Sequence, residues 1–257
     1  MLGGMSRSLA LVLVLAACSH HKAAPALVPL DKAHADAIAS APDRDERDRN
    51  RDSQRKPAEL LVFAGVAPGM HVADLGSGTG YTSELLARAV GPTGHVIAQD
   101  SPHWAGAWMD KVWGPRMKQP FMTNTQHIMR DWNDPLPPDA KDLDLVTFVA
   151  AYHDVIAEKD DSKKLDAAVF AALKHGGTFI VIDNSAKPGS GTAACEPLHR
   201  IDEQVVRDEV QKAGFKLVAE NDFMRHADDT RDWNADPGSK DPRVHTQDLF
   251  ALKFVKP

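Results

Sequence analysis

The stretch HVADLGSGTGYTSELLARAVGPTGHVIAQD, residues 71–100, has the pattern of two strands joined by a helix. The apolar runs 71–75 and 95–99 have the length of buried strands, and apolar residues in 81–90 recur at helical spacing. Two strands that follow one another through a helix form a βαβ unit, in which the strands are parallel. The stretch therefore predicts the start of a parallel sheet.

The turn after the first predicted strand has glycine at every second position, Gly76, Gly78 and Gly80. Glycine allows a sharp turn and lets the backbone approach a ligand without a Cβ in the way. The following helix presents unpaired N–H groups at its first turn. Asp100 ends the second strand, where a carboxylate can accept both hydroxyls of a ribose. The turn and the acid together predict a nucleoside-binding site.

Strands and helices alternate along the rest of the chain. Further strands are predicted at 126–129, 143–149, 178–182, 215–219 and 249–255. Helices are predicted directly after Pro57 and at 103–118, 160–174 and 199–213. This alternation predicts a doubly wound α/β fold of three layers with a mostly parallel sheet. We expect it to form one domain over residues 57–257.

Composition argues against several classes of protein. The chain of 257 residues carries 30 basic and 36 acidic residues, and its net charge of −6 argues against a nucleic-acid binder. Its two cysteines, Cys18 and Cys195, cannot form a disulfide framework. The histidines show no HxxxH or HxH spacing with a third ligand nearby, so the sequence predicts no metal site.

The first residues have the pattern of a secretion signal. Arg7 precedes an apolar run at 9–17 that is too short to span a membrane as a helix. The residues LAAC at 15–18 resemble a bacterial lipobox, which implies a signal peptide at 1–17 and lipidation of Cys18. We expect a protein tied to the periplasmic side of the cell envelope by this lipid alone, and Ser19 favours the outer membrane by the same resemblance. If the signal is misread, the protein is expected in the cytoplasm.

Residues 18–56 are expected to form a tether and a charged helix. Opposite charges in 42–57 fall at helical spacing and would pair Asp43 with Arg47, Asp45 with Arg49, and Asp52 with Lys56. Such pairs stabilise an exposed helix by about 0.2–0.5 kcal/mol each. A solvated helical face is the simpler interpretation. A lid or docking helix beside the active site is the functional one.

Several motifs resemble, in chain order, those of the class I S-adenosylmethionine-dependent methyltransferases. VADLGSGTGY at 72–81 resembles the first motif of that family, and Asp100 its ribose-binding acid. Further matches are RDW at 130–132, DLDLV at 142–146, LKHGG at 173–177 and AGF at 213–215. The resemblance covers most of residues 57–257 and is closest to a bacterial subgroup labelled only as predicted methyltransferases. It implies a seven-stranded sheet and S-adenosylmethionine as the cofactor.

The same resemblance implies which residues contact the cofactor. Asp74 would orient the methionine amino group, and the glycine turn would close around the methionine and the ribose. Tyr81 would face the sulfonium, or else pack at the start of its helix. The full implied set is Asp74, Gly76, Ser77, Gly78, Gly80, Tyr81 and Asp100, with Asp131 and Trp132 at the adenine.

Candidate catalytic residues follow the fourth and fifth predicted strands, because ligands bind at the carboxyl ends of parallel strands. They are Tyr152, His153 and Asp154, followed by Asp183 and Asn184. His153 beside Asp154 is the first choice for a general base or a substrate anchor, and capping of a loop is the structural alternative. His199 is placed to reach the same site. Arg200 is expected to pair with a nearby acid such as Glu203.

The sequence thus predicts an enzyme that moves a methyl group from S-adenosylmethionine to a small-molecule or protein acceptor by in-line displacement. A sulfonium methyl is already activated, so the protein contributes mainly by aligning nucleophile, carbon and sulfur. One alternative is a non-catalytic envelope lipoprotein that binds a nucleoside. Another is a NAD-dependent oxidoreductase, but the spacing GxGxG, in place of GxGxxG, counts against it.

Overall fold

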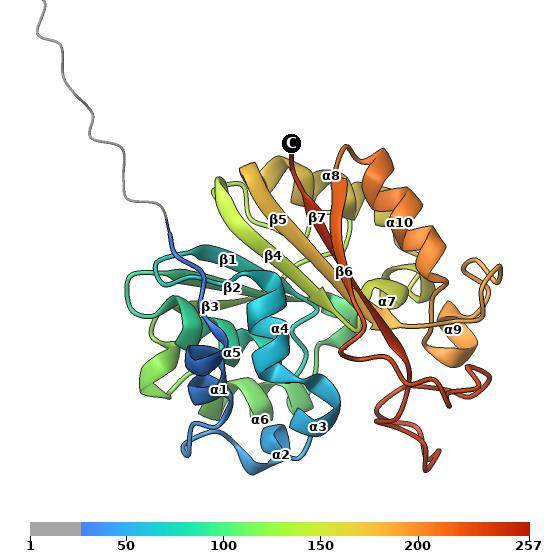
Figure 1. Ribbon diagram of the computed structural model, residues 1–257, viewed down its shortest axis with the longest axis horizontal. Helices are drawn as coiled ribbons and strands as arrows, with labels where there is room; N and C mark the ends of the chain where they lie inside the picture. Colours follow the sequence, from blue (N-terminus) through green and yellow to red (C-terminus); the bar gives the residue numbers. More distant parts are fainter. Residues whose placement is uncertain (1–26) are drawn as a thin grey trace, which may run out of the picture.

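The computed structural model describes residues 27–257, and its centre is a seven-stranded sheet (Figure 1). The strands follow the order β3-β2-β1-β4-β5-β7-β6 across the sheet. Strand β7 runs antiparallel to the other six strands, which are all parallel to one another. The strands are β1 (His71–Leu75), β2 (His95–Asp100), β3 (Thr125–Met129), β4 (Leu143–Val149), β5 (Leu173–Asn184), β6 (Lys216–Asn221) and β7 (Leu249–Val255). The predicted α/β fold with a mostly parallel sheet is confirmed.

Two apolar cores cover the two faces of this sheet. Along β1, Val72 belongs to one core and the next residue, Ala73, to the other, because successive side chains of a strand point to opposite faces. Helices α1 (Lys32–Ala39), α4 (Pro57–Ala64), α5 (Tyr81–Val90) and α6 (Ala107–Arg116) contribute to the first core. Helices α7 (Tyr152–Ala157), α8 (Ser162–Ala172) and α10 (Glu203–Lys212) contribute to the second (Figure 1). The sheet is therefore the middle of three layers, as expected.

The packed body begins before Pro57, which corrects the expected domain boundary. The backbone N–H of Leu30 donates to the carbonyl of Val66, and α1 packs against α4 and α5 with Ala35 fully buried. Asp31 caps α1 by accepting from the backbone N–H of His34. The sequence did not predict this helix, because four of its five apolar residues are alanine and give only a weak apolar pattern.

The charged segment folds as two short helices, α2 (Glu46–Arg49) and α3 (Asp52–Arg55), and not as one exposed helix. The predicted i,i+4 pairs are wrong. Asp43 pairs with Arg88 of α5, Asp45 pairs with Arg47, and Asp52 pairs with the buried Arg44. The chain breaks between α2 and α3, so these residues do not have the spacing of a single helix. Their charges pair within the segment or with α5 instead.

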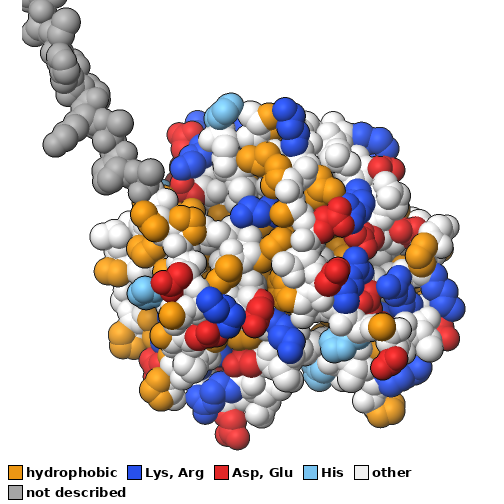
Figure 2. Space-filling model, in the orientation of Figure 1, with side chains coloured by type: hydrophobic (Ala, Val, Ile, Leu, Met, Phe, Trp, Pro, Cys, Tyr) orange, Lys and Arg blue, Asp and Glu red, His pale blue; other side chains and the backbone are white. Residues whose placement is uncertain are grey.

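The signal peptide, the lipobox and Cys18 lie outside the described residues. Within residues 27–257, no helix is both long and apolar enough to cross a bilayer. Figure 2 shows basic and acidic side chains interspersed over one face of the described part, which agrees with the modest net charge.

Candidate functional site

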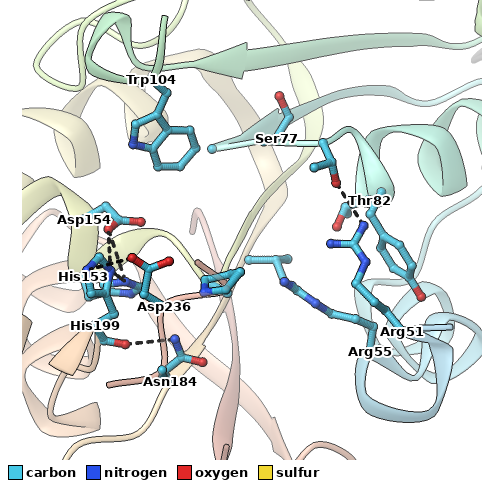
Figure 3. Close-up of a pocket in the computed structure, with 18 of the residues that line it drawn as sticks. Arg51, Arg55, Ser77, Thr82, Trp104, His153, Asp154, Asn184, His199 and Asp236 are labelled. Carbon is cyan, nitrogen blue, oxygen red and sulfur yellow. Dashed lines mark hydrogen bonds and ion pairs between the residues drawn. The ribbon is translucent and has the colours of Figure 1, made fainter. Parts of the chain in front are cut away.

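A cavity of about 390 Å³ opens at the carboxyl ends of β1 and β4 (Figure 3). The glycine turn after β1 and α3 lie on one side of it. The start of α7, the end of β5 and the loop 235–247 lie on the other side. Of the predicted site residues, those that line it are Asp74, Gly76, Ser77, Gly78, Tyr81, His153 and Asp154, together with Asn184 and His199.

The glycine turn is held by its backbone geometry and by close packing. Gly76 has a φ of +59°, and a Cβ there would lie 2.6 Å from the Cβ of Ala151. Gly80 has a φ of +78°, and a Cβ would lie 2.7 Å from Cδ of Arg116. A left-handed backbone and absent space both exclude other residues at these two positions. Gly80 itself faces α6 and is not part of the cavity wall.

Asp100 holds the turn in place. Its carboxylate accepts from the Ser77 hydroxyl at 2.9 Å and from the backbone N–H of Gly78 at 2.6 Å. Nε2 of His127 lies 2.9 Å from the same carboxylate. Asp100 is fully buried and is not among the residues that line the cavity. Its ribose contact stays a prediction, whereas its hold on the turn is a feature that the sequence did not reveal.

Asp74 is a buried carboxylate that lines the cavity. It accepts from the hydroxyls of Ser83 at 2.6 Å and Thr147 at 2.7 Å. Burial raises the pKa of Asp74 to about 7, although both hydroxyl donors favour its charged form. A cation that binds beside Asp74 would keep it ionised.

Two arginines of the charged segment also line the cavity, and the sequence analysis did not single them out. Arg51 donates to the Thr79 hydroxyl at 2.9 Å and pairs with Asp48. Arg55 has no carboxylate within ion-pair distance among residues 27–257, and burial lowers its pKa to about 10. The location of α3 beside the cavity agrees with the docking-helix interpretation of this segment. Tyr81 lies against it, with its hydroxyl donating to Asp52 at 2.6 Å.

The segment 130–132, which was expected at the adenine, does not line the cavity but supports a residue that does, Trp104. Trp132 is fully buried, and its indole N–H donates to Glu158 at 2.6 Å. Trp104, which lines the cavity, donates to the other oxygen of Glu158 and packs edge-on against Trp132. Asp131 is exposed and caps its own turn by accepting from the backbone N–H of Asn133. Neither Asp131 nor Trp132 lines the cavity, so their adenine contacts stay predictions.

His153 and its neighbours form the far end of the cavity (Figure 3). Asp183, at the end of β5, accepts from the backbone N–H of His153 and lies 2.8 Å from its Nδ1. Because Nδ1 is held in this way, Nε2 faces Asp154 and His199. Burial lowers the pKa of His153, but the carboxylates of Asp183 and Asp154 outweigh this and raise it well above its usual value.

Tyr152, the third candidate catalytic residue, points away from this site. Its side chain is fully buried, and its hydroxyl lies within hydrogen-bond distance of Asp166 at 2.9 Å and Glu209 at 3.1 Å. Tyr152 is the first residue of α7, and the turn of that helix sends adjacent side chains in different directions. It ties α7 to α8 and α10.

His199 lines the cavity and has a strained backbone conformation. Its φ is +50°, a region that residues other than glycine seldom adopt. Asn184 donates to the His199 carbonyl at 2.9 Å, and the neighbouring Arg200 is fully buried. Arg200 pairs with Asp229 at 2.7 Å, not with Glu203 as expected, because its side chain points into the loop that follows β6. These contacts fix the position of the imidazole.

The cavity suits the S-adenosylmethionine that the motifs imply. The glycine turn borders the cavity, Asp74 offers a carboxylate, and the buried Arg55 lacks an anionic partner among the described residues. An amino-acid moiety carries both the ammonium and the carboxylate that these groups would pair with. Trp104 would lie beside an aromatic ring.

Comparisons with known sequences point in the same direction. The sequence profile of the protein-L-isoaspartate(D-aspartate) O-methyltransferase family matches residues 53–103. A ubiquinone/menaquinone biosynthesis C-methyltransferase of Ectopseudomonas mendocina is 31% identical over 131 residues, which are 51% of this chain and 47% of the relative. An arsenite methyltransferase of Halobacterium salinarum is 58% identical over 39 residues, 15% of this chain and 10% of the relative. The chain spans about half the length of the C-methyltransferases that it matches.

Solved structures share the whole fold at low identity. A methyltransferase dependent on S-adenosylmethionine from Aquifex aeolicus has a TM-score of 0.58 and 16% identity, covering 89% of this chain and 100% of its own. An arsenic(III) S-adenosylmethionine methyltransferase from Chlamydomonas reinhardtii has a TM-score of 0.56 and 16% identity, covering 89% and 74%. Together with the sheet order and the glycine turn, these similarities show that the chain has the fold of the class I S-adenosylmethionine-dependent methyltransferases, and they indicate S-adenosylmethionine as its cofactor.

Proposed function

We propose that the protein transfers a methyl group from S-adenosylmethionine to an acceptor that binds at the His153 end of the cavity. The observation that carries this proposal is that one cavity joins the glycine turn to His153 and His199. A cofactor seated on the turn and an acceptor at the far end would face each other across a short distance. Alignment of this kind supplies most of the rate gain in a displacement on an activated methyl.

The residues that line the cavity have different roles at its two ends. The turn, Asp74 and Arg55 bind and orient the cofactor, and Trp104 excludes water from one wall. His153 contacts the acceptor through Nε2 as an anchor, while Asp183 orients the ring without touching the acceptor. The matched relatives are named for carbon, arsenic and oxygen acceptors, so their names do not select one for this chain. No observation favours the oxidoreductase or the non-catalytic alternative.

Two measurements test cofactor binding and turnover separately. Calorimetry should show binding of S-adenosylmethionine and S-adenosylhomocysteine and no binding of NAD; tight binding of NAD alone would refute the assignment. Incubation with methyl-labelled cofactor and a cell-envelope extract should transfer label to an acceptor.

His153→Ala should lower turnover with little change in cofactor affinity. His153→Gln retains an amide that can donate to Asp183 and checks that any loss is not caused by misfolding. His103→Ala is the matched control, because His103 is half-exposed and lies outside the cavity. Equal turnover in all four proteins would remove His153 from the mechanism.

We further propose that the mature protein is anchored to the cell envelope through lipidated Cys18. The support is the lipobox-like sequence at 15–18. Mass spectrometry of the native N-terminus should find a diacylated or triacylated cysteine; an unmodified Met1 or Met5 would contradict the anchor.

A further inference from the structure

Three potential metal ligands meet at the far end of the cavity, in the group His153, Asp154 and His199 (Figure 3). Nε2 of His153 lies 3.3 Å from Nδ1 of His199. The Oδ1 atom of Asp154 lies 3.3 Å from the first nitrogen and 3.4 Å from the second. The three atoms thus form a nearly equilateral triangle.

The size of this triangle fits an ion better than it fits hydrogen bonds. Charge-assisted N–H···O bonds are shorter, at about 2.7–2.9 Å. Ligand atoms about 2.0–2.1 Å from a tetrahedral zinc ion are separated from one another by about 3.3–3.4 Å. An octahedral ion with ligands at about 2.1 Å would bring neighbouring ligands to about 3.0 Å. The observed separations match the tetrahedral case.

Each histidine has a carboxylate behind its other ring nitrogen. Nδ1 of His153 lies 2.8 Å from Asp183, and Nε2 of His199 lies 3.6 Å from Asp236. Histidines that bind metals almost always donate their second N–H to such a group, which fixes the tautomer and the ring orientation. In His153 this leaves Nε2 directed at the triangle.

The site is also held in place before any ligand arrives. His153 is almost fully buried and receives two contacts from Asp183. His199 is held at its carbonyl by Asn184 in spite of its left-handed backbone. Strained backbone of this kind persists where the surrounding structure enforces it, and such positions cluster at functional sites.

A second cluster with ligand-type residues, His103, Glu158 and Asp160, lacks these features. Both oxygens of Glu158 already accept from the indoles of Trp104 and Trp132. Asp160 accepts from Asn133, and the side chain of His103 is half-exposed. This second cluster is therefore not expected to bind a metal ion and provides a control for the first.

From these contacts we propose that His153, His199 and Asp154 bind one divalent transition-metal ion of the zinc type, with a fourth position open to the cavity. Three protein ligands and one open position are the arrangement of catalytic zinc sites, in which the fourth ligand is water or substrate. The sequence predicted no metal site, because His153 and His199 come from separate elements and share no short motif. If methyl transfer is as proposed above, Nε2 of His153 would hold the acceptor through the ion, whose open position would take an oxygen or sulfur atom of the acceptor.

Metal binding can be tested without any assay of methyl transfer. The full-length protein, stripped with a chelator, supplied with a small excess of Zn²⁺ and dialysed against metal-free buffer, should retain one ion per chain. With Co²⁺ it should develop the intense visible bands of a tetrahedral site. His199→Gly suits the left-handed backbone and should lower zinc affinity at least about 100-fold. His103→Ala should leave affinity unchanged.

Asp183→Asn tests the positioning role of that carboxylate. It should retain stoichiometric cobalt binding with an affinity lowered about 10- to 100-fold, as for other residues behind a metal ligand. Circular dichroism and urea unfolding establish that each variant is folded. The proposal is overturned if the wild-type protein takes up no stoichiometric zinc, or if uptake is the same in wild type and His199→Gly. Because binding is measured directly, absence of methyl transfer would not affect this result.

Discussion

At the scale of single residues, the glycine turn depends on both conformation and space. Gly76 and Gly191 have the same φ of +59°, but only Gly76 has neighbours within 4 Å of an added Cβ. Gly76 lies at the cavity, and Gly191 lies in the loop before α9 (Cys195–Leu198). A comparison of substitutions at the two positions therefore distinguishes the free-energy cost of a left-handed backbone from that of a steric clash.

We predict that Gly76→Ala is more destabilising than Gly191→Ala and that it alone abolishes cofactor binding. Backbone strain at a positive φ costs on the order of 1–3 kcal/mol at either site. At Gly76 the clash with Ala151 adds to this and shifts the turn. Urea unfolding measures stability, and calorimetry measures binding of S-adenosylhomocysteine. Equal loss of stability in the two variants would contradict the packing argument.

Asp100 leads to a second prediction at this scale. Asp100→Ala removes the acceptor for Ser77 and for the backbone N–H of Gly78, so the turn loses its support. We expect binding of S-adenosylhomocysteine to weaken by about 1.5–3 kcal/mol, as for loss of a charged hydrogen-bond partner. Asp134→Ala, at an exposed surface carboxylate, should bind as the wild type does. Unchanged affinity in Asp100→Ala would exclude both the turn-holding and the ribose-binding role.

At the scale of elements, buried ion pairs connect the N-terminal segment to the methyltransferase fold. Arg116 of α6 pairs with Asp48 of α2 at 2.7 Å and also with Glu84 of α5. All three side chains are almost fully buried. The segment that carries Arg51 and Arg55 is therefore fixed beside the cavity by charges that are shielded from water.

Arg116→Met should destabilise the protein by up to about 3 kcal/mol, because it removes the cation that two buried carboxylates share and leaves Asp48 with Arg51 alone and Glu84 with Arg88 alone. Arg47→Met is the control, since the exposed pair of Arg47 with Asp45 is worth about 0–1 kcal/mol. Urea unfolding at neutral pH measures both. A loss below 1 kcal/mol in Arg116→Met would show that the segment is not held by this network.

The order of elements was largely predictable. The ranges 71–75, 81–90, 143–149 and 249–255 were predicted with the bounds that the structure shows, because each is a continuous apolar or amphipathic run between turn residues. Helix α7 was missed, since its six residues are too few to show periodicity. Helix α1 was missed because four of its five apolar residues are alanine, which gives only a weak apolar pattern.

At the scale of the whole molecule, one buried carboxyl group links stability to pH. Asp166 joins α8 to Tyr152 of α7, and burial raises its pKa to about 8. In the unfolded chain its pKa is about 3.9. Between these two values the folded protein keeps a proton that the unfolded chain releases.

The free energy of unfolding should therefore fall as pH rises from about 4 to about 8 through Asp166, by at most about 1.4 kcal/mol per pH unit. The raised pKa of Asp74 acts in the same direction up to about pH 7. Asp166→Asn cannot ionise and should reduce the slope. Urea unfolding across this pH range tests the prediction; an identical slope in the variant would contradict it.

The amino-acid sequence by itself determined the βαβ unit, the glycine turn and the cofactor, because these depend on local propensity and on short spacings along the chain. Only the tertiary structure decided which side chains share the cavity. It brought His199 to His153, directed Tyr152 into the core and placed α3 against the turn. The physical reason is that strand ends and loops far apart in the sequence meet where the sheet ends, and side-chain direction there is set by packing that no local pattern records.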